Sequence, residues 1–156
     1  MLSKIHIYFS YACYVFRHKW FVMIECFKHG LIWRGLVHDM SKFLPSEWIP
    51  YAHYFCDGRK NKTELDRAWI LHQKRNRHHP EWWVYVNEDG THCALPMEEP
   101  YLTEMICDLI CAGKAKGFCS PKNDPFFETR EFWKKNSHAM ILHPDTRAEI
   151  EKRLSV

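Results

Sequence analysis

A histidine and an aspartate stand side by side, at His38 and Asp39, near the end of an apolar segment that favours helix, and Lys42 follows three residues later. Both side chains of the pair can bind a metal. Burying them is costly, because each loses its hydration unless a partner offsets the loss. The chain must therefore fold so that other polar groups, or a cation, meet this pair inside the molecule.

A second candidate ligand is His72, on the face of a predicted helix that also carries Leu65, Ala68 and Trp69. A lone histidine on such a face is more often a satisfied core residue than a ligand. The adjacent pair His78 and His79 follows within two helical turns, which adds more imidazole groups to the same region.

Two carboxylates, Glu104 and Asp108, lie four residues apart in an apolar segment and so share one helical face. Like charges at this spacing repel, and burial adds to the cost. A metal, an arginine or a helix-capping role must therefore offset them.

A single divalent metal centre would explain the whole set together, since histidine and carboxylate ligands suit hard or borderline cations. Ligation without cysteine favours a catalytic site with open positions over a closed structural zinc site. We therefore expect one or two ions of manganese, zinc or iron. The residues that this reasoning assigns to the centre are His38, Asp39, His72, His79 and Asp108.

The cysteines offer a competing metal site. There are seven, an odd number with no CxxC pair, which favours reduced, mostly buried thiols in a cytoplasmic protein. Four of them could form a structural zinc site, although their spacings do not match those of zinc fingers or ribbons. These four are Cys93, Cys107, Cys111 and Cys119.

Composition limits the class of protein. With 156 residues, 46% of them hydrophobic and 15% aromatic, the chain is expected to form one compact domain over residues 1–156. A formal charge of +3 does not indicate a dedicated nucleic-acid binder, so nucleic acid is a possible but not a favoured partner. The apolar stretch from Ile5 to Phe16 is shorter than the roughly 20 residues of a membrane span, so we expect a core helix and no membrane partner.

The pattern along the chain is helical almost throughout, and we expect an all-α protein with one short β-hairpin near residues 83–95. Its strands, 83–86 and 92–95, would flank a turn at 87–90. Ser3 is expected to cap the first helix, a capping box with Thr63 and Asp66 to open the fourth, and 113–124 to be loop. The predicted helices span 3–30, 31–39, 45–55, 63–79 and 100–111, with two shorter ones from about Phe126 and Asp145.

The order of these residues resembles the HD-domain superfamily of metal-dependent phosphohydrolases, which are all-helical and bind metal through an adjacent His-Asp pair. The resemblance implies a single compact HD-domain-like helical bundle, with Lys42 at the lysine position of many members. His18 would supply the first histidine, with His29 as the second choice, and His78 is the alternative to His79. The implied ligands are His18, His38, Asp39, His72, His79 and Asp108.

A longer set of motifs resembles a family of small bacterial and phage proteins of unknown function. The motifs run from His38-Asp39-Met40-Ser41-Lys42-Phe43 through Ala68-Trp69 and Trp82-Trp83 to Leu142-His143-Pro144-Asp145-Thr146-Arg147. This second resemblance covers nearly the whole chain but implies no substrate.

The HD resemblance implies attack on phosphorus by a metal-activated water, with Asp39 and Lys42 as catalytic residues. Glu104 would orient a histidine ligand or act as a general acid or base. Lys74, Arg75 and Arg77 are candidates for binding phosphate, unless they are only the solvated end of a helix.

Trp82 beside this basic cluster could stack on a nucleobase, unless it packs in the core, and this makes a nucleotide the expected substrate. Two further classes stay open, an HD-type di-iron oxygenase and a non-enzymatic binding or inhibitor protein with a structural metal. The apolar first helix also leaves room for a homodimer.

Overall fold

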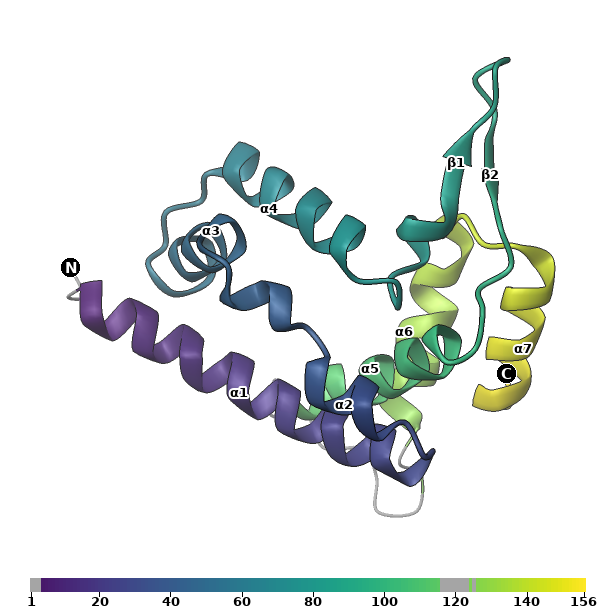
Figure 1. Ribbon diagram of the computed structural model, residues 1–156, viewed down its shortest axis with the longest axis horizontal. Helices are drawn as coiled ribbons and strands as arrows, with labels where there is room; N and C mark the ends of the chain where they lie inside the picture. The colour runs from purple at the N-terminus through teal and green to yellow at the C-terminus, as the bar shows by residue number, and fades with distance from the viewer. Residues whose placement is uncertain (1–3, 116–123, 125) are drawn as a thin grey trace.

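A computed structural model describes residues 4–115, 124 and 126–156, and in these residues the protein is a helical bundle with one small hairpin (Figure 1). The predicted all-α class with a β-hairpin is therefore confirmed. The α-helices are α1 (Lys4–Lys28), α2 (Ile32–Val37), α3 (Pro45–Cys56), α4 (Lys62–Arg75), α5 (Tyr101–Ala115), α6 (Phe127–Asn136) and α7 (Pro144–Leu154). Short 3-10 turns lie at η1 (Met40–Phe43), η2 (Pro80–Trp83) and η3 (Ser137–Ala139).

The long helix α1 is followed by a sharp reversal that lays α2 back against it. Gly30 makes this possible with a φ of 73°, a left-handed conformation that glycine adopts without steric cost. In α2, Gly35 lies against the α1 backbone, where an added Cβ would sit 3.0 Å from Cys26 Cβ and 3.2 Å from Met23 Cα. The absence of a side chain at Gly35 therefore allows the two helices to approach closely.

Two details of the predicted fourth helix are wrong. The residue that caps α4 is Asn61, whose side chain accepts a hydrogen bond from the Glu64 amide, rather than Thr63 in a capping box. The same helix ends at Arg75, where Asn76 turns into extended backbone, four residues before the predicted end. His78 and His79 therefore lie in the loop that follows α4.

The remaining elements follow the predicted order. Strands β1 (Val84–Val86) and β2 (His92–Ala94) pair in antiparallel fashion and project from the bundle (Figure 1). Helix α5 runs four residues past its predicted end, to Ala115, and the rest of the predicted loop lies outside the described residues except for Asp124. The predicted cap at Ser3 also lies outside them.

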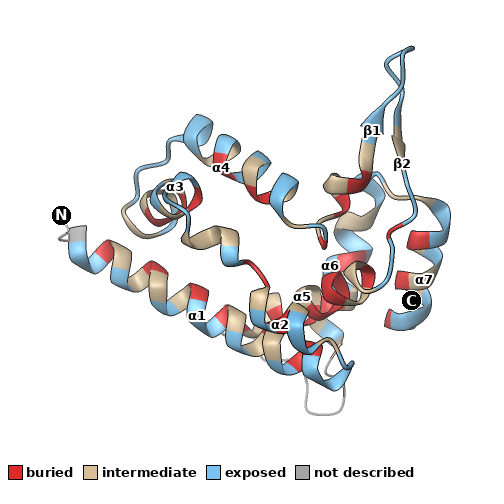
Figure 2. Ribbon diagram, in the orientation of Figure 1, coloured by how far each residue is buried: buried red, intermediate tan, exposed pale blue. Residues whose placement is uncertain are grey.

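The core has two parts, and α1 contributes to both. Val15 belongs to the part formed with α3 and α4, whereas Val22 belongs to the part formed with α5, α6 and α7. Buried positions line the inner side of α1 along its length (Figure 2). His18 lies between the two valines in sequence, so the junction of the two core regions has a buried histidine.

The outer side of α1 leaves large apolar side chains exposed, among them Phe9, Phe16 and Trp20. Such a stripe suits a partner surface, and the homodimer stays a prediction. None of the described helices is both long and apolar enough to cross a membrane.

Candidate metal centre

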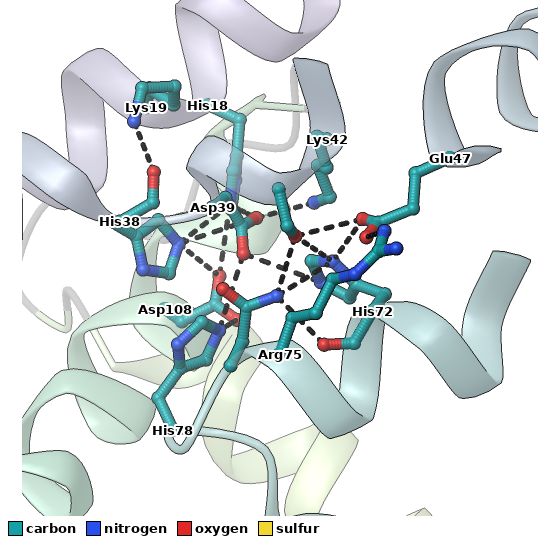
Figure 3. Close-up of polar contacts among 12 residues, drawn as sticks. His18, Lys19, His38, Asp39, Lys42, Glu47, His72, Arg75, His78 and Asp108 are labelled. Atoms are coloured by element: carbon teal, nitrogen blue, oxygen red, sulfur yellow. Dashed lines mark hydrogen bonds and ion pairs between the residues drawn. The ribbon is translucent and has the colours of Figure 1, made fainter. Parts of the chain in front are cut away.

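The His38-Asp39 pair lies just beyond the end of α2, not within it, which corrects the predicted helix. His38 is extended (φ −49°, ψ 130°) and Asp39 is left-handed (φ 54°). A left-handed aspartate is uncommon and costs on the order of 1 kcal/mol, although Asp tolerates this conformation better than most residues. On a helix the two side chains would diverge by about 100°. This break in the helix instead turns both toward the same point (Figure 3).

Three side chains from three parts of the fold meet at one side of Asp39. His18 Nε2, from α1, lies 3.4 Å from His38 Nε2, 3.5 Å from Asp39 Oδ2 and 3.1 Å from Asp108 Oδ1, on α5. His38 Nε2 lies 3.5 Å from Asp39 Oδ2 and 3.8 Å from Asp108 Oδ1. Ligand atoms about 2.1 Å from a tetrahedral metal are about 3.4 Å apart, so these separations suit a bound cation. We call His18, His38 and Asp108, with Asp39 Oδ2, the first group.

The other oxygen of the same aspartate faces a second set of histidines. Asp39 Oδ1 lies 3.3 Å from His72 Nε2 and 3.4 Å from His78 Nε2. A ligand atom of His79 also lies within 4.8 Å of the ligand atoms of the other three residues. We call His72, His78 and His79, with Asp39 Oδ1, the second group. Asp39 therefore lies between the two groups and offers one oxygen to each.

Glu104 fixes the outer side of two of these histidines. Its Oε1 lies 2.9 Å from His38 Nδ1 and 3.2 Å from His78 Nδ1, and its Oε2 accepts a hydrogen bond of 2.6 Å from Arg34 Nε. Because the carboxylate engages both Nδ1 atoms, both Nε2 atoms are turned toward Asp39. The arginine and the histidines also explain how a carboxylate that is 1% exposed can stay charged.

Glu47 on α3 does the same for His72. Its Oε2 lies 2.9 Å from His72 Nδ1 and also accepts a hydrogen bond of 2.9 Å from Ser41 Oγ. Its Oε1 accepts one of 2.6 Å from Arg75 Nη1. Metal-binding histidines usually donate their second ring nitrogen to such a carboxylate, so both glutamates occupy the positions expected around a metal site.

Two lysines reach the centre from its edges. Lys42 Nζ lies 2.5 Å from Asp39 Oδ2, and burial of this ammonium is outweighed by Asp39 and Asp108, so its pKa is raised. Lys19 donates to the His38 carbonyl and fixes the backbone at the end of α2. Lys42 is therefore a charged group placed directly beside the aspartate of the centre.

The pKa values of four imidazole groups are shifted, two upward and two downward. Burial opposes protonation of His18 and His78, but hydrogen bonds to Asp108 and Asp39 raise the His18 pKa to about 9, and bonds to Asp39 and Glu104 raise the His78 pKa to about 10. Burial dominates at the other two, so the pKa of His38 is lowered and that of His79 is lowered well below its usual range. Protons and metal compete for the same nitrogens.

The donor set fits a metal ion on independent grounds. Asp39 Oδ1, His78 Nε2 and His79 Nε2 are buried polar atoms that make no well-aligned hydrogen bond in the described part of the chain, although Asp39 Oδ1 and His78 Nε2 lie 3.4 Å apart as an ion pair. Such atoms are rare because each loses its hydration without compensation, and a bound cation would satisfy all three. These buried imidazole and carboxylate groups could therefore hold a metal ion.

The structure brings together every predicted metal residue, namely His18, His38, Asp39, His72, His79 and Asp108, and adds His78. The second-choice His29 is exposed at the end of α1 and belongs to no group of possible ligands among the described residues. No role was predicted for Glu47 or Arg34. Glu47 stands in the first turn of α3, where an acidic residue is ordinary, and nothing local marks Arg34.

The four predicted substrate-binding residues are not all together. Arg75 and Arg77 line one hollow, whereas Lys74 lines another, formed with the hairpin. Trp82 lies under the Arg77 guanidinium, whose carbon is 4.7 Å from the ring centroid. Their predicted role in binding a substrate phosphate stays a prediction.

The fold and the centre define a small helical protein that gathers histidines and carboxylates from distant helices around one buried aspartate. The chain belongs to a family of unknown function, DUF5662, which it matches over residues 8–156. No curated protein and no solved structure matches it.

Proposed function

We propose that the protein is a metal-dependent phosphohydrolase that acts on a small phosphoester, with a nucleotide as the expected substrate. The single observation that supports this most strongly is the position of Asp39. It presents one carboxylate oxygen to each of two groups of histidines, which is the arrangement expected of an aspartate shared by two metal ions.

Divalent metals held by these residues would supply Lewis acidity and an activated water at neutral pH. The first group and the second group would each hold one ion. Glu104 and Glu47 keep the Nε2 atoms of His38, His78 and His72 aimed inward. In this position Glu104 acts as a positioning residue, the first of its two predicted roles.

A hollow of about 390 Å³ lies between α1, α3 and α4, beside this centre. Lys42 lines it and also contacts Asp39, so a phosphoryl group in the hollow would meet the lysine ammonium beside the aspartate. The walls are mostly aromatic, with Tyr14 stacked on His18 and Trp69 stacked on His72. An aromatic leaving group, such as a nucleoside, suits these walls.

The test is phosphate release from nucleoside mono- and triphosphates and from an aryl phosphate, with manganese, zinc or iron(II) added in turn. We expect turnover in the wild type and its loss in His38→Ala and Asp39→Ala. Lys134→Gln, which removes an exposed charge on α6 outside this hollow, is the control that should retain activity. Equal turnover in the wild type and in Asp39→Ala would contradict the proposal.

A second candidate is a di-iron oxygenase, because the same aspartate between two histidine groups also suits a pair of irons. Substrate-dependent oxygen consumption by iron-loaded protein, without phosphate release, would replace the first proposal with this one.

A further inference from the structure

A separate hollow of about 320 Å³ lies between α2, the end of α4 and the start of α5, on the outer side of Glu104. Three guanidinium groups line it, those of Arg34, Arg75 and Arg77. We call this hollow the arginine pocket.

The positive charge of the arginine pocket is only partly neutralised. Arg34 pairs with Glu104, and Arg75 pairs with Glu47. Arg77 forms no ion pair with a carboxylate among the residues that the structure describes. Its neighbours there are Tyr101, whose hydroxyl accepts a hydrogen bond of 3.2 Å, and the aromatic rings beneath it. An anion in the pocket would offset this excess charge.

The guanidinium groups of Arg34 and Arg77 are held in place, and most of their N–H donors are unused. The Arg34 carbon lies 4.2 Å and the Arg77 carbon 5.4 Å from the centroid of the same Tyr101 ring. Within the described residues, Arg34 donates through Nε alone and Arg77 through Nη1 alone. Each side chain has five N–H donors, so most of them stay available for the oxygens of a ligand.

None of the proposed metal ligands lines the arginine pocket. Glu104 lines the pocket, and its carboxylate meets the Nδ1 atoms of His38 and His78, whereas the Nε2 atoms of both rings face Asp39. A ligand in the pocket is therefore separated from the metal positions by Glu104 and two imidazole rings.

We propose that the arginine pocket binds the phosphate group of a small phosphorylated molecule, at a site distinct from the metal centre. Planar guanidinium groups bind phosphate oxygens in pairs, and three of them around one hollow favour phosphate over a single carboxylate. A volume of about 320 Å³ is near the lower limit for ligand sites and suits a phosphate with a small organic group. Arg75 and Arg77 are thus assigned to this ligand, not to the phosphoryl group that is cleaved.

The bound phosphate would act on the centre through Arg34. An anion that draws this guanidinium toward itself weakens its bond to Glu104, and Glu104 in turn holds His38 and His78. This consequence, unlike the binding itself, rests on the proposed function. Phosphate binding and the arrangement of the two histidines would then be linked.

The experiment is titration of inorganic phosphate into the full chain, treated with chelator, by isothermal calorimetry. We expect saturable binding, about tenfold weaker in Arg77→Gln and unchanged in Lys74→Gln, which removes a neighbouring charge outside the arginine pocket. Arg77→Lys keeps the charge without the planar fork and should weaken binding to a lesser extent. No binding to the wild type, or equal weakening in Arg77→Gln and Lys74→Gln, would overturn the proposal.

Nitrogen NMR of the imidazole rings in the same titration tests the link to the centre. The His38 and His78 ring signals should move with phosphate saturation in the wild type. Binding without these shifts would overturn the link through Arg34. The titration contains no metal, so it tests phosphate binding independently of catalysis. If the protein binds phosphate here but cleaves no phosphoester in the metal-supplemented assay, the proposed function is contradicted and the arginine pocket is still supported.

Discussion

Glu104 holds two candidate ligands through one carboxylate oxygen, so its loss should disturb both metal groups together. Glu104→Gln keeps the shape of the side chain but removes the charge that fixes His38 and His78. We expect metal affinity to fall about 10- to 100-fold with the fold retained. Calorimetric titration of manganese or zinc would measure it.

The control for this change is Glu99→Gln, a glutamate near the start of α5 that binds Thr103 and Arg153 at the surface. It should leave the metal affinity unchanged. An unaltered affinity in Glu104→Gln would mean that this carboxylate does not position the ligands.

Metal binding should release protons, because His18 and His78 are protonated at neutral pH when their pKa values are about 9 and about 10. A metal needs the neutral imidazole, so at pH 7.5 about one proton should leave His18 when the first group binds its ion, and about one should leave His78 when the second group binds its own. The affinity for metal should therefore fall as the pH drops and rise toward pH 9. Calorimetry in buffers of different ionisation enthalpy counts the protons. A count of zero would show that these two rings are not ligands.

Single residues of the centre could be predicted where an ionisable side chain interrupts an apolar segment. His38, Asp39, His72 and Asp108 each stood out as ionisable groups in apolar segments. The choice between His78 and His79 could not be made, because both rings become available only when α4 ends at Arg75.

The residues that could not be predicted from the sequence contact the candidate ligands on the side away from the proposed metals, directly or through Glu104. Glu47 and Arg34 act on the centre through contacts with residues 25 and 70 positions away. No local pattern encodes such pairs, since the spacing is set by how the helices pack.

At the scale of elements, the contact between α1 and α2 sets the distance from His18 to His38. In Gly35→Ala the new Cβ would meet the α1 backbone at 3.2 Å, which forces α2 outward. We expect overpacking of about 1–3 kcal/mol to outweigh a gain of up to about 1 kcal/mol in helix propensity. Metal affinity should fall as well, because His38 moves away from α1. Urea unfolding and metal titration would measure the two effects.

Leu36→Ala is the matched control, a change in the same helix at a position that is 47% exposed. It should affect both quantities little. If Gly35→Ala matched the wild type in stability and affinity, the close approach of α2 to α1 would not position the site.

The boundaries of elements were the weakest part of the sequence prediction. Apolar periodicity favoured helix up to Asp39, yet the chain leaves the helix after Val37 and Asp39 adopts φ 54°. Periodicity reports the face that a helix buries, but it does not report where the polar contacts of a site pull the backbone out of the helix.

At the scale of the whole molecule, the centre lies where the two core regions meet. Candidate ligands come from α1 and α5, from α4 and from the loop that follows α4. The sequence predicted the helices and most of the candidate ligands, but it could not place the junction, because that depends on α1 contributing to both regions. A metal bound there would join the two parts of the core.

The most direct measurement is metal content per chain by plasma mass spectrometry, on protein purified without chelator or nickel affinity, beside the Asp39→Ala variant. One or two equivalents of manganese, zinc or iron should be present in the wild type and absent from the variant, since Asp39 faces both groups. A folded wild-type protein that carries no metal and cannot be reconstituted with any of the three would contradict the metal centre.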